Sequence, residues 1–313
     1  MAFDKTSLAP EQAEQALAKW LGKPAGLTGI RRLHGGMINS VLELRFEAPP
    51  GSAVIKVSPK LGQGAFQSEA RGLRYLKEHA AFPVPDVYLV ESDGETVPLA
   101  FILLGRLEGL NLGEASRLEP RCHRDIDEHM AEVLTELHSH TRETYGVVGE
   151  EPGADDWIEL FGSRVRSVHE ECRQKLNTET FQQAGRVIDS LDVFLAPAGR
   201  PTLVHGDIWA TNVIVKKEGR RWRLSGFVDP GAQYADVEYE LAYLQVFHTA
   251  GDRFFELYGR DNEIREGYEL RRLVYWLNTM LIHVRTFGDA HYVRQTEQLS
   301  SILTSVLDRH GAV

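Results

Sequence analysis

The spacing of hydrophobic positions divides the chain into two parts. From Leu27 to Leu104, short runs of β-branched and apolar residues alternate with turns that contain glycine and proline, a pattern that predicts strands. One helical stretch interrupts them, because apolar residues recur at helical spacing between Phe66 and His79. We therefore expect residues 1–104 to form a lobe with an antiparallel sheet and a helix, preceded by a short amphipathic N-terminal helix.

Beyond Gly105 the apolar spacing becomes mainly helical. Amphipathic patterns predict helices in four stretches, namely 126–140, 157–172, 180–195 and 239–313. Strand-like character returns only within residues 201–231. The order of these elements predicts an α+β fold in which a larger, mainly helical lobe, residues 105–313, follows the sheet.

Composition and charge narrow the possible partners. The 313 residues carry a formal net charge of −10, and there is no basic stripe, so we expect no nucleic-acid partner. We see no apolar run long enough to span a bilayer and no signal peptide. Cys122 and Cys172 have neither disulfide nor zinc spacing, which favours a reducing compartment and a cytoplasmic location. The oligomeric state stays open.

The motif with the most specific spacing is His205-Gly206-Asp207, with Asn212 five positions after the aspartate. Phosphoryl transfer needs a carboxylate beside the attacking hydroxyl and an oxygen ligand for Mg²⁺ on the same short loop. The motif thus predicts Asp207 as catalytic base, Asn212 as metal ligand and His205 as support for the loop. The alternative is an ordinary turn after a strand.

A second carboxylate follows downstream. Asp229 comes at the end of a strand-like segment, Phe227-Val228-Asp229-Pro230, and a hairpin with Glu218-Gly219 at its turn fits between it and Asn212. That position predicts a second Mg²⁺ ligand. The alternative is a simple turn, because Asp-Pro is common in turns.

A lysine lies on a predicted strand of the first lobe. Lys56 stands among apolar residues in Val54-Ile55-Lys56-Val57, and Glu69 lies thirteen residues later at the start of the predicted helix. An ammonium held there by the glutamate would contact the phosphates of ATP. Taken in isolation, this segment fits an alternating strand with a solvated lysine better than a phosphate-binding lysine.

Two backbone segments complete the candidate nucleotide site. Gly35, Gly36 and Asn39 join two strands, where glycines would let backbone N–H groups approach phosphates; a plain hairpin turn is the alternative. A candidate hinge for adenine comprises Leu103, Leu104, Gly105 and Arg106. The decisive feature is order: glycine loop, lysine, glutamate, hinge, catalytic loop and metal aspartate follow one another as a single ATP site requires.

With these residues in place, the chain resembles the fructosamine kinase family, within the group that includes aminoglycoside phosphotransferases and choline kinases. The similarity covers most of the chain and includes the segments GGMIN, FQSEARGLRYLKE, DPGAQYADVEYELAYLQVF and LVYWLNTMLIHVRTFGDAHYV. It implies a protein-kinase-like two-lobed fold, ATP and Mg²⁺ as cofactors, and phosphorylation at the 3-hydroxyl of a ketosamine, free or protein-bound, in the repair of glycated amines.

The sequence identifies the residues of the acceptor pocket less clearly than those of the ATP and metal sites. Trp209 and Trp157 match family positions, His283 lies in a segment that departs from the family pattern, and Asp236 and Glu238 could supply charge to a cationic amine. Glu240 is expected to cap a helix or face solvent. Two segments, GEEPGADDW and IHVR, depart from the family pattern. The acceptor could therefore be another hydroxylated amine, such as an aminoglycoside, choline-like or homoserine-like compound. A catalytically inactive binding protein is disfavoured because Lys56, Asp207, Asn212 and Asp229 are all present.

Overall fold

The computed structural model describes residues 8–33, 40–62 and 64–310. Chain packing divides it into two compact units, Met1–His129 with Ala210–Gly231, and Met130–Trp209 with Ala232–Val313. The division falls inside the predicted catalytic loop, between Trp209 and Ala210. The two lobes predicted from the sequence, 1–104 and 105–313, were defined by function, as an ATP-binding lobe and a lobe with the catalytic loop and acceptor pocket. That functional division stays a proposal.

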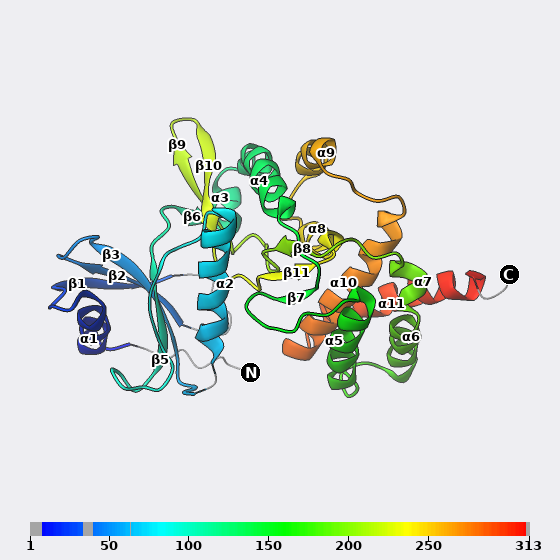
Figure 1. The fold of residues 1–313 in the computed structure, drawn as a ribbon, viewed down its shortest axis with the longest axis horizontal. Coiled ribbons are helices and arrows are strands. Elements are labelled where there is room, and N and C mark those ends of the chain that lie inside the picture. The colour runs from blue at the N-terminus through cyan, green and yellow to red at the C-terminus, as the bar shows by residue number, and fades with distance from the viewer. Residues whose placement is uncertain (1–7, 34–39, 63, 311–313) are drawn as a thin grey trace. The chain divides into compact units, whose positions relative to one another are not determined.

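The first unit is built around a five-stranded antiparallel sheet (Figure 1). Its strand order is β1-β2-β3-β5-β4. These strands and the helices beside them are α1 (Pro10–Leu21), β1 (Leu27–Arg32), β2 (Ser40–Phe46), β3 (Ser52–Ser58), α2 (Ala65–Ala80), β4 (Val87–Glu91) and β5 (Ala100–Gly105). α2 confirms the helix predicted from Phe66 to His79, and it packs against β4 and β5. Apolar residues of α1 and of the sheet form one core.

A smaller sheet belongs to the same unit. Its order is β10-β9-β6, with β9 and β10 joined as an antiparallel hairpin. The elements are β6 (Leu110–Asn111), α3 (Leu112–Leu118), β9 (Val213–Glu218) and β10 (Arg221–Phe227), and α4 (Cys122–Ser139) begins in this unit. The predicted hairpin between Asn212 and Asp229 is therefore present.

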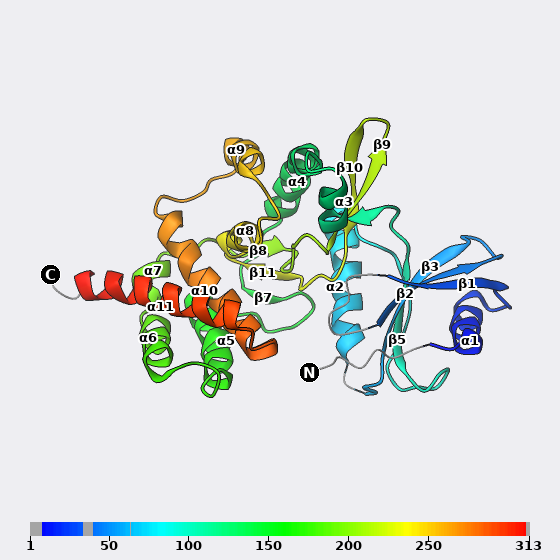
Figure 2. The ribbon, with the colours of Figure 1, turned by 180° about the vertical axis from the view of Figure 1, so that it is seen from behind.

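The second unit is mainly helical, and Figure 2 shows its helices from behind. Its elements are β7 (Gly146–Val147), α5 (Trp157–Glu171), α6 (Thr178–Asp189), α7 (Leu191–Leu195), β8 (Thr202–Val204), β11 (Gln233–Ala235), α8 (Val237–Val246), α9 (Asp252–Asp261), α10 (Tyr268–Thr286) and α11 (Ala290–His310). α10 contacts α5, α8 and α11, and these contacts bury the core of the unit. This unit also contains a three-stranded sheet in the order β7-β11-β8. Its strand β8 ends at Val204, directly before the predicted catalytic loop.

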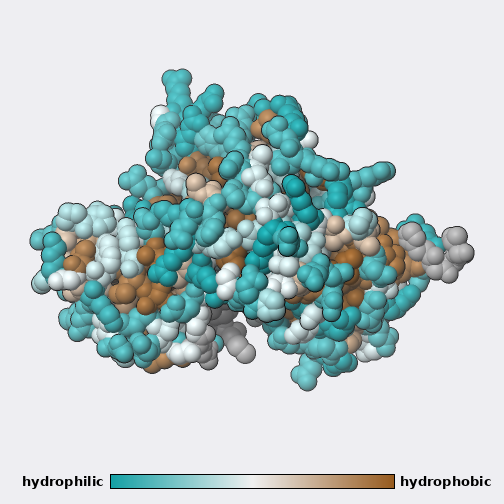
Figure 3. Space-filling view, in the orientation of Figure 1, coloured by the Kyte–Doolittle hydropathy of each residue, from teal (hydrophilic) through white to brown (hydrophobic). Residues whose placement is uncertain are grey.

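Few large apolar side chains are exposed among the described residues. Figure 3 shows one face, which is mostly hydrophilic with scattered apolar patches. The exposed large apolar residues are Leu61, Leu110, Leu118, Val193 and Ile302. Scattered residues of this kind are normal for a globular surface. None of the helices in the described ranges is long and apolar enough to cross a membrane.

Candidate active site

The first group of candidate residues surrounds Lys56, in the middle of the five-stranded sheet. β3 lies between β2 and β5, and Lys56 pairs in register with Val41 and Ile102. Its side chain is only 7% exposed. The ammonium donates to Glu69 Oε1 of α2 at 2.7 Å and also contacts Asp229. The predicted pairing with Glu69 is present, and the alternative of a solvated lysine is wrong.

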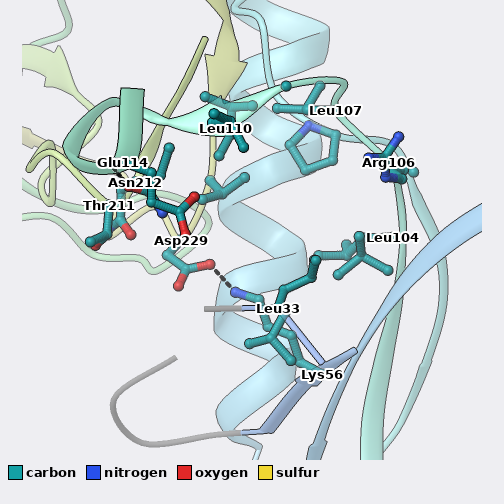
Figure 4. Close-up of a pocket in the computed structure, with 18 of the residues that line it drawn as sticks. Leu33, Lys56, Leu104, Arg106, Leu107, Leu110, Glu114, Thr211, Asn212 and Asp229 are labelled. Atoms are coloured by element: carbon teal, nitrogen blue, oxygen red, sulfur yellow. Dashed lines mark hydrogen bonds and ion pairs between the residues drawn. The ribbon is translucent and has the colours of Figure 1, made fainter. Parts of the chain in front are cut away.

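Asp229 follows β10 in an uncommon backbone conformation. Its φ is 59°, in the left-handed region that disfavours residues with a Cβ atom. The preceding residue is held in place, because Val228 N–H donates to Asn212 O at 3.0 Å. The chain thus holds a strained turn at this point, and Figure 4 shows the Asp229 carboxylate directed at Lys56.

A cavity within the first unit brings Lys56, Asn212 and Asp229 together (Figure 4). Its empty space, open mouth included, amounts to about 1030 Å³. The lining residues come from the sheet, from the segment after β5 and from the hairpin: Arg31, Arg32, Leu33, Val41, Val54, Lys56, Pro85, Leu104, Gly105, Arg106, Leu107, Gly109, Leu110, Asn111, Glu114, Thr211, Asn212, Ile214, Val228 and Asp229.

The cavity offers chemically suitable groups for ATP and Mg²⁺. Val54, Leu104 and Ile214 give it apolar walls against which a base can pack, and Lys56 supplies a cation for phosphates. Mg²⁺ is held by oxygen ligands, commonly one or two carboxylates together with substrate phosphates. The Asp229 carboxylate is 37% exposed, so it is accessible to such an ion. Within the described residues no group of three or more His, Cys, Asp or Glu side chains is arranged for a metal.

The predicted hinge lies partly in the cavity wall. Leu104, Gly105 and Arg106 line it, whereas Leu103 is fully buried in the core of the sheet. Arg106 is held in place by Glu43, whose carboxylate is 1% exposed and lies 2.9 Å from Arg106 Nε. The backbone of this segment is thus positioned at the cavity, while its role toward adenine stays a prediction.

The predicted glycine loop, with Gly35, Gly36 and Asn39, lies outside the described residues. The strands on either side of it are described: β1 and β2 pair as antiparallel neighbours, with Arg32 opposite Leu42. Of these two strands, Arg31, Arg32 and Val41 line the cavity. Its role as a phosphate cradle stays a prediction.

Gly109, Asn111 and Glu114 are among the lining residues that were not predicted from the sequence. Gly109 has a φ of 124°, and a Cβ there would lie 2.1 Å from the carbonyl oxygen of Val215, so only glycine fits. Asn111 caps α3, because its side chain accepts a hydrogen bond from Glu114 N–H at 2.9 Å. The Asn-x-x-Glu spacing is a helix-start signal that could have located this segment.

The second unit holds the first part of the predicted catalytic loop, up to Trp209, directly after β8. Gly206 has a φ of 84°, which a glycine tolerates, and the turn brings Asp207 N–H 3.3 Å from the ring nitrogen Nδ1 of His205. The His205 side chain is fully buried. The Asp207 carboxylate accepts a hydrogen bond from the hydroxyl of Tyr243 at 2.5 Å. His205 thus lies where it can support the loop.

Glu240 anchors this loop from α8. It is 1% exposed, so the expectation that it caps a helix or faces solvent is wrong. Its carboxylate accepts hydrogen bonds from Gly206 N–H at 2.6 Å and pairs with His138 Nε2 at 2.9 Å. The other ring nitrogen of His138 lies 2.7 Å from the hydroxyl of Tyr258. Burial alone would raise the pKa of Glu240, but the bonds from His138 and Gly206 prevail and lower it.

Two of the candidate acceptor residues lie in a buried ion-pair network. Asp236 caps α8 and accepts hydrogen bonds from Gly199 N–H at 2.9 Å and from Arg265 at 2.6 Å. Glu238 pairs with Arg265 and Arg271. Both carboxylates are fully buried. These contacts favour a structural role for the two residues over a role in binding an amine.

The aromatic candidates divide into two groups. Trp157 is 1% exposed and donates to the hydroxyl of Tyr275 at 3.0 Å, so it belongs to the core. Trp209 and His283 are both partly exposed and both lie beside Phe247, with ring centroids 6.4 and 5.2 Å away. Of the predicted acceptor residues, these two share one aromatic cluster in the unit that carries Asp207.

Comparison with known proteins extends these observations. A protein-ribulosamine 3-kinase from Oryza sativa subsp. indica is 25% identical over 312 residues, which cover 93% of this chain and 84% of the relative. A solved structure of a candidate fructosamine-3-kinase from Thermobifida fusca has a TM-score of 0.74 at 19% identity, covering 94% of this chain and 99% of the other.

A third similar protein is an aminoglycoside phosphotransferase. Its structure, solved with ADP and hygromycin B, has a TM-score of 0.63 at 17% identity, covering 94% of this chain and 98% of that one. These structures confirm the α+β, protein-kinase-like fold predicted from the sequence. The sequence model described as fructosamine kinase matches residues 10–306, nearly the whole chain. The chain therefore belongs to the fructosamine kinase family.

Proposed function

We propose that this protein is an ATP- and Mg²⁺-dependent kinase that phosphorylates a sugar hydroxyl of a ketosamine. The observation that carries the proposal is the contact of Lys56 with both Glu69 and Asp229, because Lys56 and Asp229 line one cavity. Family membership supports the same acceptor class, as does the name of the plant relative, a protein-ribulosamine 3-kinase. The cofactor Mg²⁺, the site residues and the position of the phosphorylated hydroxyl are parts of this proposal.

The nucleotide and metal groups have distinct roles in this proposal. Lys56, held by Glu69, neutralises charge on the phosphates of ATP. Asn212 and Asp229 supply oxygen ligands for Mg²⁺, which stabilises negative charge on the phosphate oxygens when bound. Residues 1–104 form the ATP-binding lobe, with the hinge at its end, and residues 105–313 carry the catalytic loop and the acceptor pocket.

Asp207 is the proposed catalytic base. It orients the acceptor hydroxyl and takes its proton as the bond from oxygen to the γ-phosphorus forms and the bond from that phosphorus to ADP breaks; the proton then passes to solvent. Because Glu240 fixes Gly206 and His205 contacts Asp207 N–H, the loop is held before the substrate arrives. Catalysis of this kind depends mainly on positioning and on charge stabilisation.

The acceptor is proposed to be a small amine–sugar adduct, free or on a protein side chain. Trp209 and His283 are the candidates retained for its pocket, because they are partly exposed beside Phe247. Both cysteines are buried free thiols, which fits the proposed cytoplasmic location.

The test is release of ADP by the purified protein with Mg-ATP. Fructose-lysine and ribulose-lysine are compared with an aminoglycoside and with no acceptor, and Asp207→Asn serves as the inactive control. Stimulation by a ketosamine alone supports the proposal. Stimulation by the aminoglycoside alone, or by none of the acceptors, refutes the ketosamine assignment.

A further inference from the structure

The register of the five-stranded sheet assigns a carboxylate, Glu43, to the face that lines the cavity. Partners on neighbouring strands share a face, and so do residues two positions apart along one strand. Val54 and Lys56 of β3 both line the cavity, and Val54 pairs with Glu43 of β2. The side chain of Glu43 therefore lies on the cavity face, whereas apolar side chains of the other face form the core with α1.

Glu43 is a buried carboxylate surrounded by arginines. Its side chain is 1% exposed, and it lies 2.9 Å from Arg106 Nε. It also accepts hydrogen bonds from Arg31 Nε at 2.7 Å and from Arg45 Nε at 3.3 Å. Burial raises the pKa of Glu43, but the three arginines outweigh burial and lower it, so the carboxylate is ionised at neutral pH. One buried negative charge thus holds three cationic side chains.

Arg106 is the member of this cluster that is both fixed and accessible from the cavity. It lines the cavity, and its side chain is 24% exposed. The contact with Glu43 is made through Nε. Among residues 8–33, 40–62 and 64–310 the structure shows no other hydrogen bond or ion pair of the Arg106 side chain. The guanidinium is therefore held at one edge, and the rest of it is available to a ligand.

Arg106 lies away from the groups proposed to bind phosphates. Gly105, directly before it, pairs with Ala53, which is three positions before Lys56 on β3. Three positions of a strand span about 10 Å. Figure 4 shows Arg106 across the cavity from Asp229. A nucleotide whose phosphates lie at Lys56 therefore has the Arg106 end of the cavity for its ribose and base.

We propose that Glu43 is a positioning residue that holds the guanidinium of Arg106 against the base of the bound nucleotide. The inference rests on the proposed function, because it takes the cavity as the nucleotide site. A guanidinium is planar and packs favourably on the face of an aromatic ring. Since arginine has a flexible side chain, fixing it before the ligand arrives reduces the ordering cost of binding. The pair thus adds affinity for the nucleoside part of ATP and none for its phosphates.

Two variants and a matched control separate this role from a structural one. Arg106→Met removes the guanidinium, and Glu43→Gln removes the charge that holds it. The control is Glu91→Gln, because Glu91 of β4 is also buried, with 4% of its side chain exposed, and it pairs with Lys19 at 2.7 Å. Its partner in the register is Phe101, a residue of the core, so Glu91 lies on the other face of the sheet.

Isothermal titration calorimetry with Mg²⁺ and without acceptor measures Kd for ATP and for inorganic tripolyphosphate. We expect Arg106→Met and Glu43→Gln each to raise the Kd for ATP about tenfold and to leave the Kd for tripolyphosphate unchanged. Glu91→Gln should bind both ligands as the wild type does. An unchanged Kd for ATP in Arg106→Met overturns the proposal. So does an equal loss for tripolyphosphate, because the arginine would then act on phosphates, or an equal loss in Glu91→Gln.

The double variant tests whether Glu43 acts through Arg106. If it does, the variant that carries both substitutions binds ATP no more weakly than Arg106→Met alone, whereas an additive loss of about a hundredfold overturns the positioning role. Melting temperatures are measured in parallel. If Glu43→Gln does not fold, Glu43→Asp takes its place with the same expected outcomes, because it keeps the charge and shortens its reach.

The binding assay contains no acceptor, so its result is separate from the acceptor assignment. If ketosamines do not stimulate ADP release while the expected changes in the Kd for ATP are found, the ketosamine assignment fails and the role of Glu43 and Arg106 stands. If the wild-type protein binds ATP no more tightly than tripolyphosphate, the role of Glu43 and Arg106 is overturned, whatever the acceptor.

Discussion

Replacement of Glu240 with alanine tests how the catalytic loop is held. The carboxylate is buried and makes two hydrogen bonds, to Gly206 N–H and to His138, so the variant leaves both partners without an acceptor inside the protein. Removing one side of a buried, hydrogen-bonded charge pair costs about 3–5 kcal/mol. Glu240→Gln keeps the shape and one acceptor oxygen, and it should cost about 1–2 kcal/mol.

These free energies translate into shifts of the melting temperature. For a unit of this size 1 kcal/mol corresponds to about 2–4 °C, so Glu240→Ala should lower the Tm by about 6–20 °C and Glu240→Gln by a few degrees. The control is Glu269→Ala, because that carboxylate is 73% exposed and pairs with Arg272 on the same helix. Such a surface pair contributes little, and its loss should change the Tm by about 1–2 °C at most.

The pH dependence gives an independent check of the same contact. The pKa of Glu240 is lowered in the folded protein, so its stabilising contribution is present above the ordinary carboxyl pKa of 4.5 and is lost as the pH falls through the lower folded value. The Tm difference between wild type and Glu240→Gln should therefore shrink in acid. The reasoning is refuted if Glu240→Ala melts within 2 °C of the wild type, or if the difference grows as the pH falls.

Three further outcomes follow from the contacts of the site. Lys56→Met should lower kcat/KM for ATP by at least about a hundredfold, because the phosphates lose their buried cation; an unchanged value in the ADP-release assay would contradict the role. Asp207→Asn should abolish turnover yet keep the thermal shift that ATP induces, and wild-type-like turnover would exclude it as the base. Chelation of Mg²⁺ by EDTA should reduce the ATP-induced thermal shift in the wild type and have little effect in Asp229→Ala, whereas an equal reduction in both would argue against Asp229 as a ligand.

The strand and the helix that carry Lys56 and Glu69 could be predicted from the sequence, because each shows its own spacing of apolar residues. The strand around Lys56 and the helix that opens near Glu69 each have a clear apolar period, and the partners meet as expected at 2.7 Å. The boundary between α6 and α7 could not be found in this way. One continuous helix was predicted over 180–195, but Ser190 leaves the helical conformation, with φ −121° and ψ 30°, and a one-residue break does not change the apolar spacing.

The long-range parts of the site have no comparable signal. His138 lies 102 residues from Glu240, and Asp207 lies 36 residues from Tyr243. Nothing in the sequence near either residue shows that these side chains will meet, because their contact depends on how α8 packs in the folded unit. The same limit applies to Leu103: Leu104 and Gly105, which follow it on β5, line the cavity, whereas its own side chain lies in the core.

The carboxylates at the start of α8 show that the charge of a residue alone does not predict whether it is exposed or binds a substrate. Asp236, Glu238 and Glu240 alternate with apolar residues and look like the exposed side of a helix, or like a negative patch for a cationic substrate. In the structure all three are buried and paired: Asp236 with Gly199 N–H and Arg265, Glu238 with Arg265 and Arg271, and Glu240 with His138 and Gly206 N–H. A buried charge persists only if it is paired, so this cluster cannot lose a partner without a large cost. The segment therefore acts as a rigid support, and Trp209 and His283, which are partly exposed beside Phe247, are the candidates that we propose for the acceptor pocket.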